Sequence, residues 1–379
     1  MFEPSSSPDL DRVTGLVSRR FSVMERYIES GILTFSIDPH SPDVKNSFEG
    51  LVRELKSEGQ VPFLRKAGDV LLIRVFGRPQ TGRRSNRTAL ILLVITATVI
   101  FVHGYLLGSD ELWATHLTPS FPPYLYGVTF TAALLGIIAT HELGHLTLLR
   151  RNKIESSLPY FIPGIPGLGP FTPPTFGAVI VQREVPPNRD RLFDLGISGP
   201  LFGLVATVVV AVLAALSAPI LPNAQVALIE EALSRSFMEA PSPSLPIPAL
   251  LQIIMNLVLP PVGEDSTVIL PLIFGAAWVG MLITFLNALP AWQLDGGHLA
   301  RAVLGERMHV YTTLASVAFL MIIGFWPMAF LVLLLWTMSG GKVAGPLDDY
   351  SKVTTGRKLM FVALLIIAGL SAPLPFSIV

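Results

Sequence analysis

The sequence TAALLGIIATHELGHLTLLRR, residues 131–151, begins as an apolar run and ends with two arginines. Its first half is typical of a membrane-spanning helix, yet its second half contains His141, Glu142 and His145. Ionisable side chains within a membrane span are costly, so they indicate a function by default. On a helix, residues 141 and 145 lie one turn apart on the same face. Two imidazoles at this spacing can bind one metal ion, and Glu142 can take a proton from a water held there.

The composition of the whole chain also indicates a membrane protein. Of its 379 residues, 51% are hydrophobic and 14% are charged, whereas soluble domains carry about 25% charged residues. The mean hydropathy is +0.59. The formal net charge is zero, so nothing indicates a nucleic-acid partner, and the absence of cysteine excludes disulfides and thiolate metal ligands. The amino terminus lacks a signal-peptide pattern, so we expect the first spanning helix to direct insertion.

Seven apolar stretches are candidate membrane spans, although a full crossing needs about 20 apolar residues. They are residues 89–107, 124–149, 193–216, 268–289, 310–326, 327–338 and 359–370. The fifth and sixth are short and meet at residues 324–327, so they form either one broken helix or a tight hairpin. We predict an α-helical polytopic membrane protein with about seven spans.

The distribution of basic residues between the spans predicts the topology, because Lys and Arg favour the cytoplasmic side. These basic residues cluster before the first span, where Arg83 and Arg84 lie. They also cluster between the second and third spans, after the fourth span and before the last span. The intervening loops, residues 108–123 and 217–266, contain a single basic residue, Arg235. This alternation requires residues 310–338 to cross twice. It predicts a multi-pass protein of the cell membrane, with its amino terminus in the cytosol and the histidine pair near the cytosolic face.

Residues 1–80 are typical of a small soluble α+β domain. Two strands turn at residues 29–31, a helix follows between a Ser-Pro-Asp start at 41–43 and Gly59, and two more strands turn at 67–69. We expect a cytosolic accessory or recognition module. The remainder divides into a membrane-embedded core, residues 81–308, and C-terminal transmembrane helices, residues 309–379.

Two histidines are not enough for a catalytic zinc site, which usually has three protein ligands and one open position. Position 151 is arginine, so the pattern H-E-x-x-H-x-x-G-x-x-H is absent. The other candidates within or next to the spans are His103, Asp194, Asp295 and His298. Asp295, in NALPAWQLDGGHLARAVLG (287–305), ends the fourth span at a depth similar to that of His145. An Asp before two glycines can equally form a plain turn, so these residues alone leave the third ligand open.

The pair of motifs HELGH (141–145) and NALPAWQLDGGH (287–298) resembles the site-2 protease family of intramembrane zinc metalloproteases. The segment between them, residues 157–203, is similar as well, and the resemblance covers about residues 89–305. It implies a three-helix zinc-protease core and one Zn²⁺ per chain, held by His141, His145 and Asp295. It also implies that Glu142 is the general base and that Asn287 positions the substrate. The implied reaction is hydrolysis of peptide bonds in or near transmembrane segments of single-span membrane-protein substrates within the lipid bilayer.

The sequence disfavours three alternatives to this prediction. A transporter would need inverted repeats or several midplane charges, which the sequence lacks. A proteolytically inactive, membrane-bound metal-binding relative would normally lose Glu142 or a ligand, and this chain keeps all four. A prenyl-protein protease has its own H-E-x-x-H but lacks the L-D-G-G partner. No PDZ domain fits between the two motifs, so we do not expect substrate selection by such a domain.

Several other residues have candidate roles in substrate binding, helix packing or support of the ligands. Residues 176–183, FGAVIVQR, form either an edge strand for an extended substrate or an ordinary interfacial hairpin. Gly199 and Gly203, four residues apart, are expected to allow close helix contact. His298 is either a residue that supports the ligands or a structural one. The remaining histidines are expected to be structural or exposed: His40, His103, His116 and His309.

Overall fold

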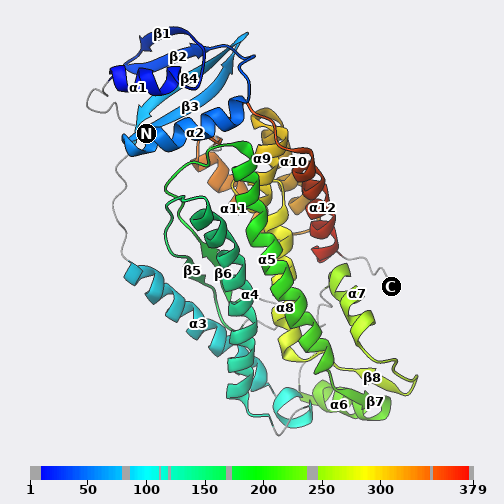
Figure 1. The fold of residues 1–379 in the computed structure, drawn as a ribbon. Coiled ribbons are helices and arrows are strands. Elements are labelled where there is room, and N and C mark those ends of the chain that lie inside the picture. The colour runs from blue at the N-terminus through cyan, green and yellow to red at the C-terminus, as the bar shows by residue number, and fades with distance from the viewer. Residues whose placement is uncertain are drawn as a thin grey trace.

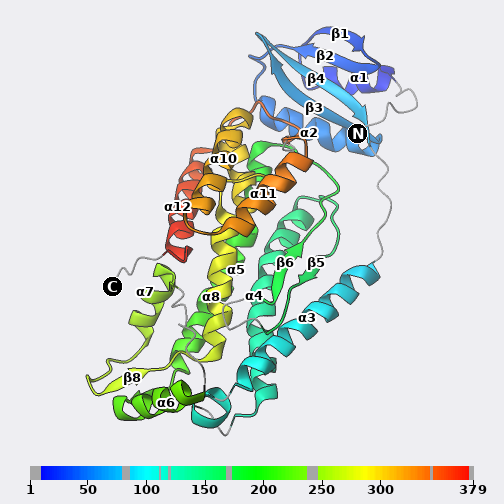
Figure 2. The same cartoon turned by 180° about the vertical axis from the view of Figure 1, so that it is seen from behind.

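The computed structural model describes residues 10–78, 86–110, 112–117, 121–167, 173–236, 246–341 and 345–374. A small α+β region lies at one end of a bundle of helices (Figures 1 and 2). Three short elements lie at the other end: β7 (Ile220–Pro222), α6 (Asn223–Ser236) and β8 (Ser266–Val268). The predicted cytosolic residues Arg83 and Arg84 lie outside the described residues.

The N-terminal region is a four-stranded antiparallel sheet with two helices packed on one hydrophobic core. Its elements are α1 (Leu10–Ser18), β1 (Val23–Glu29), β2 (Ile32–Ile37), α2 (Val44–Ser57), β3 (Gln60–Ala67) and β4 (Val70–Gly77). The strand order is β1-β2-β4-β3, so β1 and β3 are the edge strands. The predicted order of two strands, a helix and two strands is confirmed. Helix α1 was not predicted; it buries Val13 and Val17 in the same core.

Helix α2 shows why this region folds as the sequence indicates. The Asp43 side chain caps the helix by accepting a hydrogen bond from the backbone N–H of Asn46. Phe48, Leu51 and Leu55 recur at helical spacing and are fully buried against the sheet. The opposite face of α2 is polar and contributes to the contact with the helical bundle.

Among the described residues, three helices are long and apolar enough to cross a membrane, by length and composition alone. They are α3 (Asn86–Gly108), α4 (Pro123–Arg151) and α5 (Arg189–Leu216). The other predicted spans contain shorter helices: α8 (Leu272–Ala288), α10 (Glu306–Ile322), α11 (Trp326–Met338) and α12 (Thr355–Ser371). At about 1.5 Å per residue these cover roughly 20–26 Å, less than the ~30 Å of a bilayer core. The seven-span topology therefore stays a prediction.

The remaining elements connect these helices. They are η1 (Leu112–Leu117), β5 (Tyr160–Pro163), β6 (Thr175–Val179), β7 (Ile220–Pro222), α6 (Asn223–Ser236), α7 (Ala249–Val258), β8 (Ser266–Val268) and α9 (Asp295–Leu304). Strands β5 and β6 form an antiparallel hairpin, and β7 pairs with β8. The hairpin lies beside α3 and α4 in both views.

Helices α10 and α11 form a hairpin rather than one broken helix. The chain turns at Gly324, which has a φ of +85°. The two ends of the hairpin that lie away from this turn both contact Trp292. His309, in the first turn of α10, donates to the Trp292 carbonyl at 3.0 Å, and the Trp292 indole N–H donates to Ser339 Oγ, just after α11, at 3.3 Å. The Trp292 backbone N–H also donates to Thr313 Oγ1, midway along α10, at 3.0 Å. The start of α10 and the end of α11 therefore lie at the same end of the bundle.

Helix α4 lies in the middle of the bundle, packed against α3, α5 and α8. Its apolar half contributes Phe130, Leu134 and Ile137 to the main hydrophobic core, where Val279 and Phe285 of α8 meet them. Helix α5 also packs against α9. The arrangement brings the last turns of α4, the first turns of α5 and the start of α9 together.

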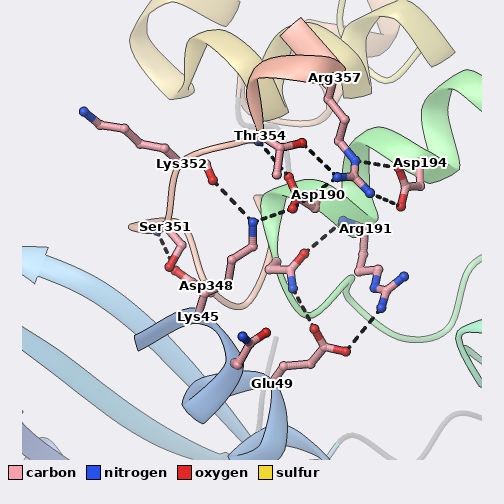
Figure 3. A network of polar contacts seen from close by, with 12 residues as sticks. Lys45, Glu49, Asp190, Arg191, Asp194, Asp348, Ser351, Lys352, Thr354 and Arg357 are labelled. Atoms are coloured by element: carbon pink, nitrogen blue, oxygen red, sulfur yellow. Dashed lines mark hydrogen bonds and ion pairs between the residues drawn. The ribbon is translucent and has the colours of Figure 1, made fainter. Parts of the chain in front are cut away.

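Polar contacts join the N-terminal region to this end of the bundle (Figure 3). Lys45 of α2 pairs with Asp190 of α5, and Glu49 accepts a hydrogen bond from Asn188 at 3.1 Å. Lys56 donates to Glu184 at 2.8 Å and to the Lys153 carbonyl, just after α4, at 2.9 Å. The region is thus docked where α4 ends and α5 begins.

Candidate metal centre

The two histidines of the opening motif lie on one face of α4, as their spacing predicts. His141 is only 4% exposed and His145 is partly buried. Their Nε2 atoms are 3.2 Å apart. Two imidazole nitrogens at this distance share one small volume, which a single cation can occupy.

Asp295 is the first residue of α9 and completes the cluster. The helix of the fourth predicted span, α8, ends at Ala288, one residue from its predicted end, and residues 289–294 separate it from Asp295. The carboxylate of Asp295 lies 3.0 Å from His141 Nε2 through Oδ2 and 3.3 Å from His145 Nε2 through Oδ1. Of the candidates His103, Asp194, Asp295 and His298, only Asp295 joins the histidines in a three-residue group, among the described residues.

The donor atoms fit a tetrahedral zinc ion. The three ligand atoms all lie within 4.8 Å of one another. Zinc–ligand bonds of about 2.0–2.1 Å at tetrahedral angles place neighbouring donors about 3.3 Å apart, close to the observed 3.0–3.3 Å. Two imidazoles and one carboxylate leave a fourth position for water, which is the donor set of a catalytic zinc site.

The orientation of His145 depends on a backbone carbonyl of α5. His145 Nδ1 donates to the Leu195 carbonyl oxygen at 3.0 Å, and the Ser198 hydroxyl lies 3.3 Å from the same nitrogen. This hydrogen bond fixes the tautomer in which Nε2 keeps its lone pair for a metal. The sequence pointed to neither residue, because the Leu195 carbonyl belongs to the backbone and only the fold brings the Ser198 hydroxyl to His145.

Glu142 follows His141 on α4 and is 6% exposed. It lies outside the three-residue group, so its carboxylate is not grouped with the ligand atoms. Within the described part of the chain, no hydrogen bond is recorded for that carboxylate. A buried carboxylate beside the ligands, and not among them, is free to exchange a proton with a water at the fourth position.

Helix α5 approaches the histidines through glycines. A Cβ atom on Gly199 would come within 2.6 Å of His141 Nε2 and even closer to His145 Nε2, and one on Gly203 would lie 2.9 Å from His141 Nδ1. In the same contact between α4 and α5, a Cβ atom on Gly144 would lie 2.5 Å from the Ser198 carbonyl oxygen. The close helix contact expected at Gly199 and Gly203 is present, and the face of α4 that meets these glycines carries His141 and His145.

The two glycines after Asp295 begin a helix and do not form the plain turn that was the alternative interpretation of this stretch. Gly296 and Gly297 lie in the first turn of α9, and neither has a positive φ. A Cβ on Gly296 would overlap the Ala288 carbonyl, and one on Gly297 the Ala291 and Trp292 carbonyls. They therefore let α9 begin directly against the preceding turn, which sets the position of the Asp295 carboxylate.

The remaining residues singled out from the sequence have different surroundings. Asn287 lies in the last turn of α8, partly exposed, and no hydrogen bond is recorded for its side chain within the described residues. His298 lies on α9 with a buried Nδ1 that has no partner among the described residues. His103 accepts from the Gly167 N–H at 3.2 Å, and His309 Nε2 donates to the Trp292 carbonyl at 3.0 Å. These last two histidines are structural.

Comparisons with known proteins agree with this geometry. The family model of peptidase family M50 matches residues 129–334. The chain is 27% identical over 294 residues to a probable zinc metalloprotease EGY2, chloroplastic, from Arabidopsis thaliana, covering 75% of this chain and 48% of that protein. It is 30% identical over 186 residues to a probable zinc metalloprotease EGY1, chloroplastic, from the same organism, covering 48% of this chain and 30% of the relative. The chain thus spans less than half the length of these curated relatives.

Proposed function

The chain belongs to peptidase family M50, the site-2 protease family, and from this premise we propose that it is an intramembrane zinc metalloprotease. Its reaction is hydrolysis of peptide bonds in or near the transmembrane segments of single-span membrane proteins. The observation that carries the proposal is the convergence of His141, His145 and Asp295 from two helices beside a buried Glu142.

The four residues have distinct roles in this proposal. His141, His145 and Asp295 hold one Zn²⁺, which when bound lowers the pKa of its water towards about 7 and polarises a carbonyl. Glu142 accepts the proton of the attacking water and later passes it to the leaving amine. Asn287, partly exposed and without a recorded partner, donates a hydrogen bond to the substrate backbone near the scissile bond.

The β5–β6 hairpin offers a place for an extended substrate. A transmembrane helix must unwind before cleavage, because its carbonyls are otherwise engaged in backbone hydrogen bonds. Within the described residues β6 pairs only with β5, and it lies beside α4 in both views. Its Phe176 and Val179 side chains are exposed. The free edge of β6 receives the unwound substrate as an added strand.

The membrane topology has seven spans, with the N-terminal region and the metal centre towards the cytosol. The loop charges support this arrangement, as does the α10–α11 hairpin, whose two ends both contact Trp292 through His309 and Ser339. The contacts of α2 with the end of α4 and the start of α5 put the N-terminal region and the metal centre in the same half of the molecule. A cytosolic position gives water a short path to the site.

A transporter and an inactive metal-binding relative are not favoured, because the chain retains all three ligands and the buried Glu142. The decisive experiment is cleavage of a panel of single-span substrates by the purified chain in proteoliposomes. We expect cleavage that is lost on chelation and restored by added zinc. Zinc binding without cleavage of any member of the panel would support the inactive relative.

A further inference from the structure

A short segment near the carboxyl end of the chain lies against a buried arginine of α9. In this segment, residues 345–350, the Asp349 carboxylate accepts two hydrogen bonds from Arg301, at 2.9 and 2.7 Å. Arg301 is 2% exposed. Gly345 closes over the same guanidinium, where a Cβ atom would overlap Nη2. We call residues 345–350 the strap.

Asp349 also binds the first residue of α5. Arg189 Nε donates to Asp349 Oδ1 at 3.0 Å, and Arg189 Nη2 donates to the Asp349 backbone carbonyl at 2.7 Å. One carboxylate therefore holds guanidinium groups from α5 and from α9. Each of these helices supplies one element of the metal centre: the Leu195 carbonyl that orients His145, and the third ligand Asp295.

The strap is itself held by the edge of the N-terminal sheet. The Leu64 N–H of β3 donates to the Leu347 carbonyl at 2.9 Å, and Arg65 donates to the same carbonyl at 2.7 Å. On its other side the strap pairs with Asn188, just before α5. The strap thus lies between the N-terminal region and the two helices that complete the metal centre.

We propose that Asp349 is a positioning residue for the metal centre. By joining the start of α5 to α9, it holds the Asp295 carboxylate against His141 and His145, and the edge of β3 holds Asp349 in place. The inference rests on the proposed function, since it assigns a support to that same zinc site. It also gives the N-terminal region a physical connection to catalysis.

The test compares zinc affinity in purified full-length variants by competition with a chromophoric chelator. Asp349→Asn keeps the size of the side chain and removes its charge. Groups that hydrogen-bond a metal ligand directly typically contribute about 10–100-fold to metal affinity. Asp349 acts on the ligands through α5 and α9, so we expect this variant to raise the zinc Kd about tenfold, the lower end of that range. Asp349→Glu, which keeps the charge, should recover most of the affinity. In zinc-saturated protein, kcat should fall for Asp349→Asn while KM changes little.

Asp194 provides the matched control. It accepts two hydrogen bonds from Arg357, at 2.7 and 2.8 Å (Figure 3), and so joins α5 to α12; within the described residues it makes no hydrogen bond or ion pair with α9. Asp194→Asn removes a similar ion pair and should leave the zinc Kd within about twofold. If Asp349→Asn does not fold, Arg189→Gln tests the same connection more gently, with an expected rise of a few-fold in Kd.

The outcomes are distinguishable. Equal zinc affinity in wild type, Asp349→Asn and Asp194→Asn, with both variants losing thermal stability, would make the Asp349 cluster an ordinary structural ion pair and overturn the inference. A few-fold loss of zinc affinity in Arg65→Ala supports the contribution of the β3 edge, and unchanged affinity removes that part. A wild-type chain that binds no zinc overturns the metal centre itself, before any variant is compared.

Discussion

Gly199 of α5 faces His145 of α4 so closely that a Cβ atom placed on Gly199 would overlap the Nε2 atom of that histidine. The same Cβ would lie 2.6 Å from Nε2 of His141. Both nitrogens are proposed zinc ligands, so the absence of a side chain at position 199 keeps the donor atoms accessible.

Gly199→Ala should therefore weaken zinc binding more than it weakens the fold. The added methyl group must displace either an imidazole or the backbone of α5, and the interior is too densely packed to absorb this freely. We expect loss of most bound zinc in metal analysis of the purified variant. Gly136→Ala on α4 is the control, since a Cβ there meets nothing within 4 Å; it should keep full occupancy. Equal zinc content in the two variants would contradict the proximity argument.

Removal of a single ligand should empty the site. Wild type should contain about one equivalent of zinc, and His145→Ala and Asp295→Ala should each lose most of it, because two remaining ligands bind zinc weakly. The measurement is metal content after dialysis against a mild chelator. Full occupancy in both variants would remove the assignment of the three ligands.

Glu142→Gln separates catalysis from metal binding. The substitution keeps the size of the side chain and removes its basic carboxylate, and general-base catalysis typically contributes about 10²–10⁴-fold. The variant should keep its zinc and its fold and cleave substrate at least about a hundredfold more slowly. Metal content and cleavage rate are measured on the same preparation. Loss of zinc would make Glu142 a ligand or a structural residue, and an undiminished rate would refute the mechanism.

Membrane sidedness can be read with single cysteines, because the native chain has none. Ser57 at the end of α2, Ser217 after α5 and Thr355 at the start of α12 are all exposed positions. In sealed vesicles, an impermeant thiol reagent should label Ser57→Cys and Thr355→Cys from one side and Ser217→Cys from the other. Labelling of positions 57 and 217 from the same side would mean that the proposed topology is wrong.

The ion pairs of Asp349 with Arg301 and Arg189 should make the free energy of unfolding depend on pH. Burial alone raises the pKa of the Asp349 carboxyl, but hydrogen bonds from Arg301 and the charges of Arg301, Arg189 and Arg65 outweigh it, so its pKa lies below the ordinary 3.8. A carboxyl whose pKa falls on folding stabilises the folded state above its unfolded value and loses that contribution as the pH drops.

The expected signature is a difference between two melting curves. Wild type should exceed Asp349→Asn in Tm at pH 6, and the gap should shrink below about pH 4 as the carboxyl is protonated. The measurement is thermal unfolding of both proteins in detergent from about pH 6 to about pH 3, which gives the difference in Tm at each pH. A gap that stays constant down to pH 3 would show that the charge of Asp349 does not stabilise the fold.

Local patterns in the sequence predicted much of the site. The four-residue spacing of His141 and His145 is a property of one helix, and it placed both imidazoles on one face. The loop charges put Asp295 at the right depth, but the choice of Asp295 over its alternatives needed the family resemblance. Strand and turn patterns likewise predicted the order of elements in the N-terminal sheet.

Features that depend on distant backbone could not be predicted. The Leu195 carbonyl that orients His145 belongs to an apolar residue with no chemical signal of its own. Asp349 meets Arg301 only because the chain returns after the α10–α11 hairpin, and it meets Arg189 across 160 residues of sequence. Helix α1 is short and lies next to a Ser- and Pro-rich start, so its two buried valines were too weak a pattern to predict it.

The turn before Asp295 bears on how this protein can be shortened for expression. Trp292 has a φ of +41°, a strained conformation for a residue with a side chain, and its N–H, carbonyl and indole bind Thr313, His309 and Ser339. All three partners lie beyond residue 308. A fragment that ends after the two sequence motifs would keep every proposed zinc donor but lose the contacts that support the loop before Asp295. Shortened versions of this chain should therefore extend at least through Ser339.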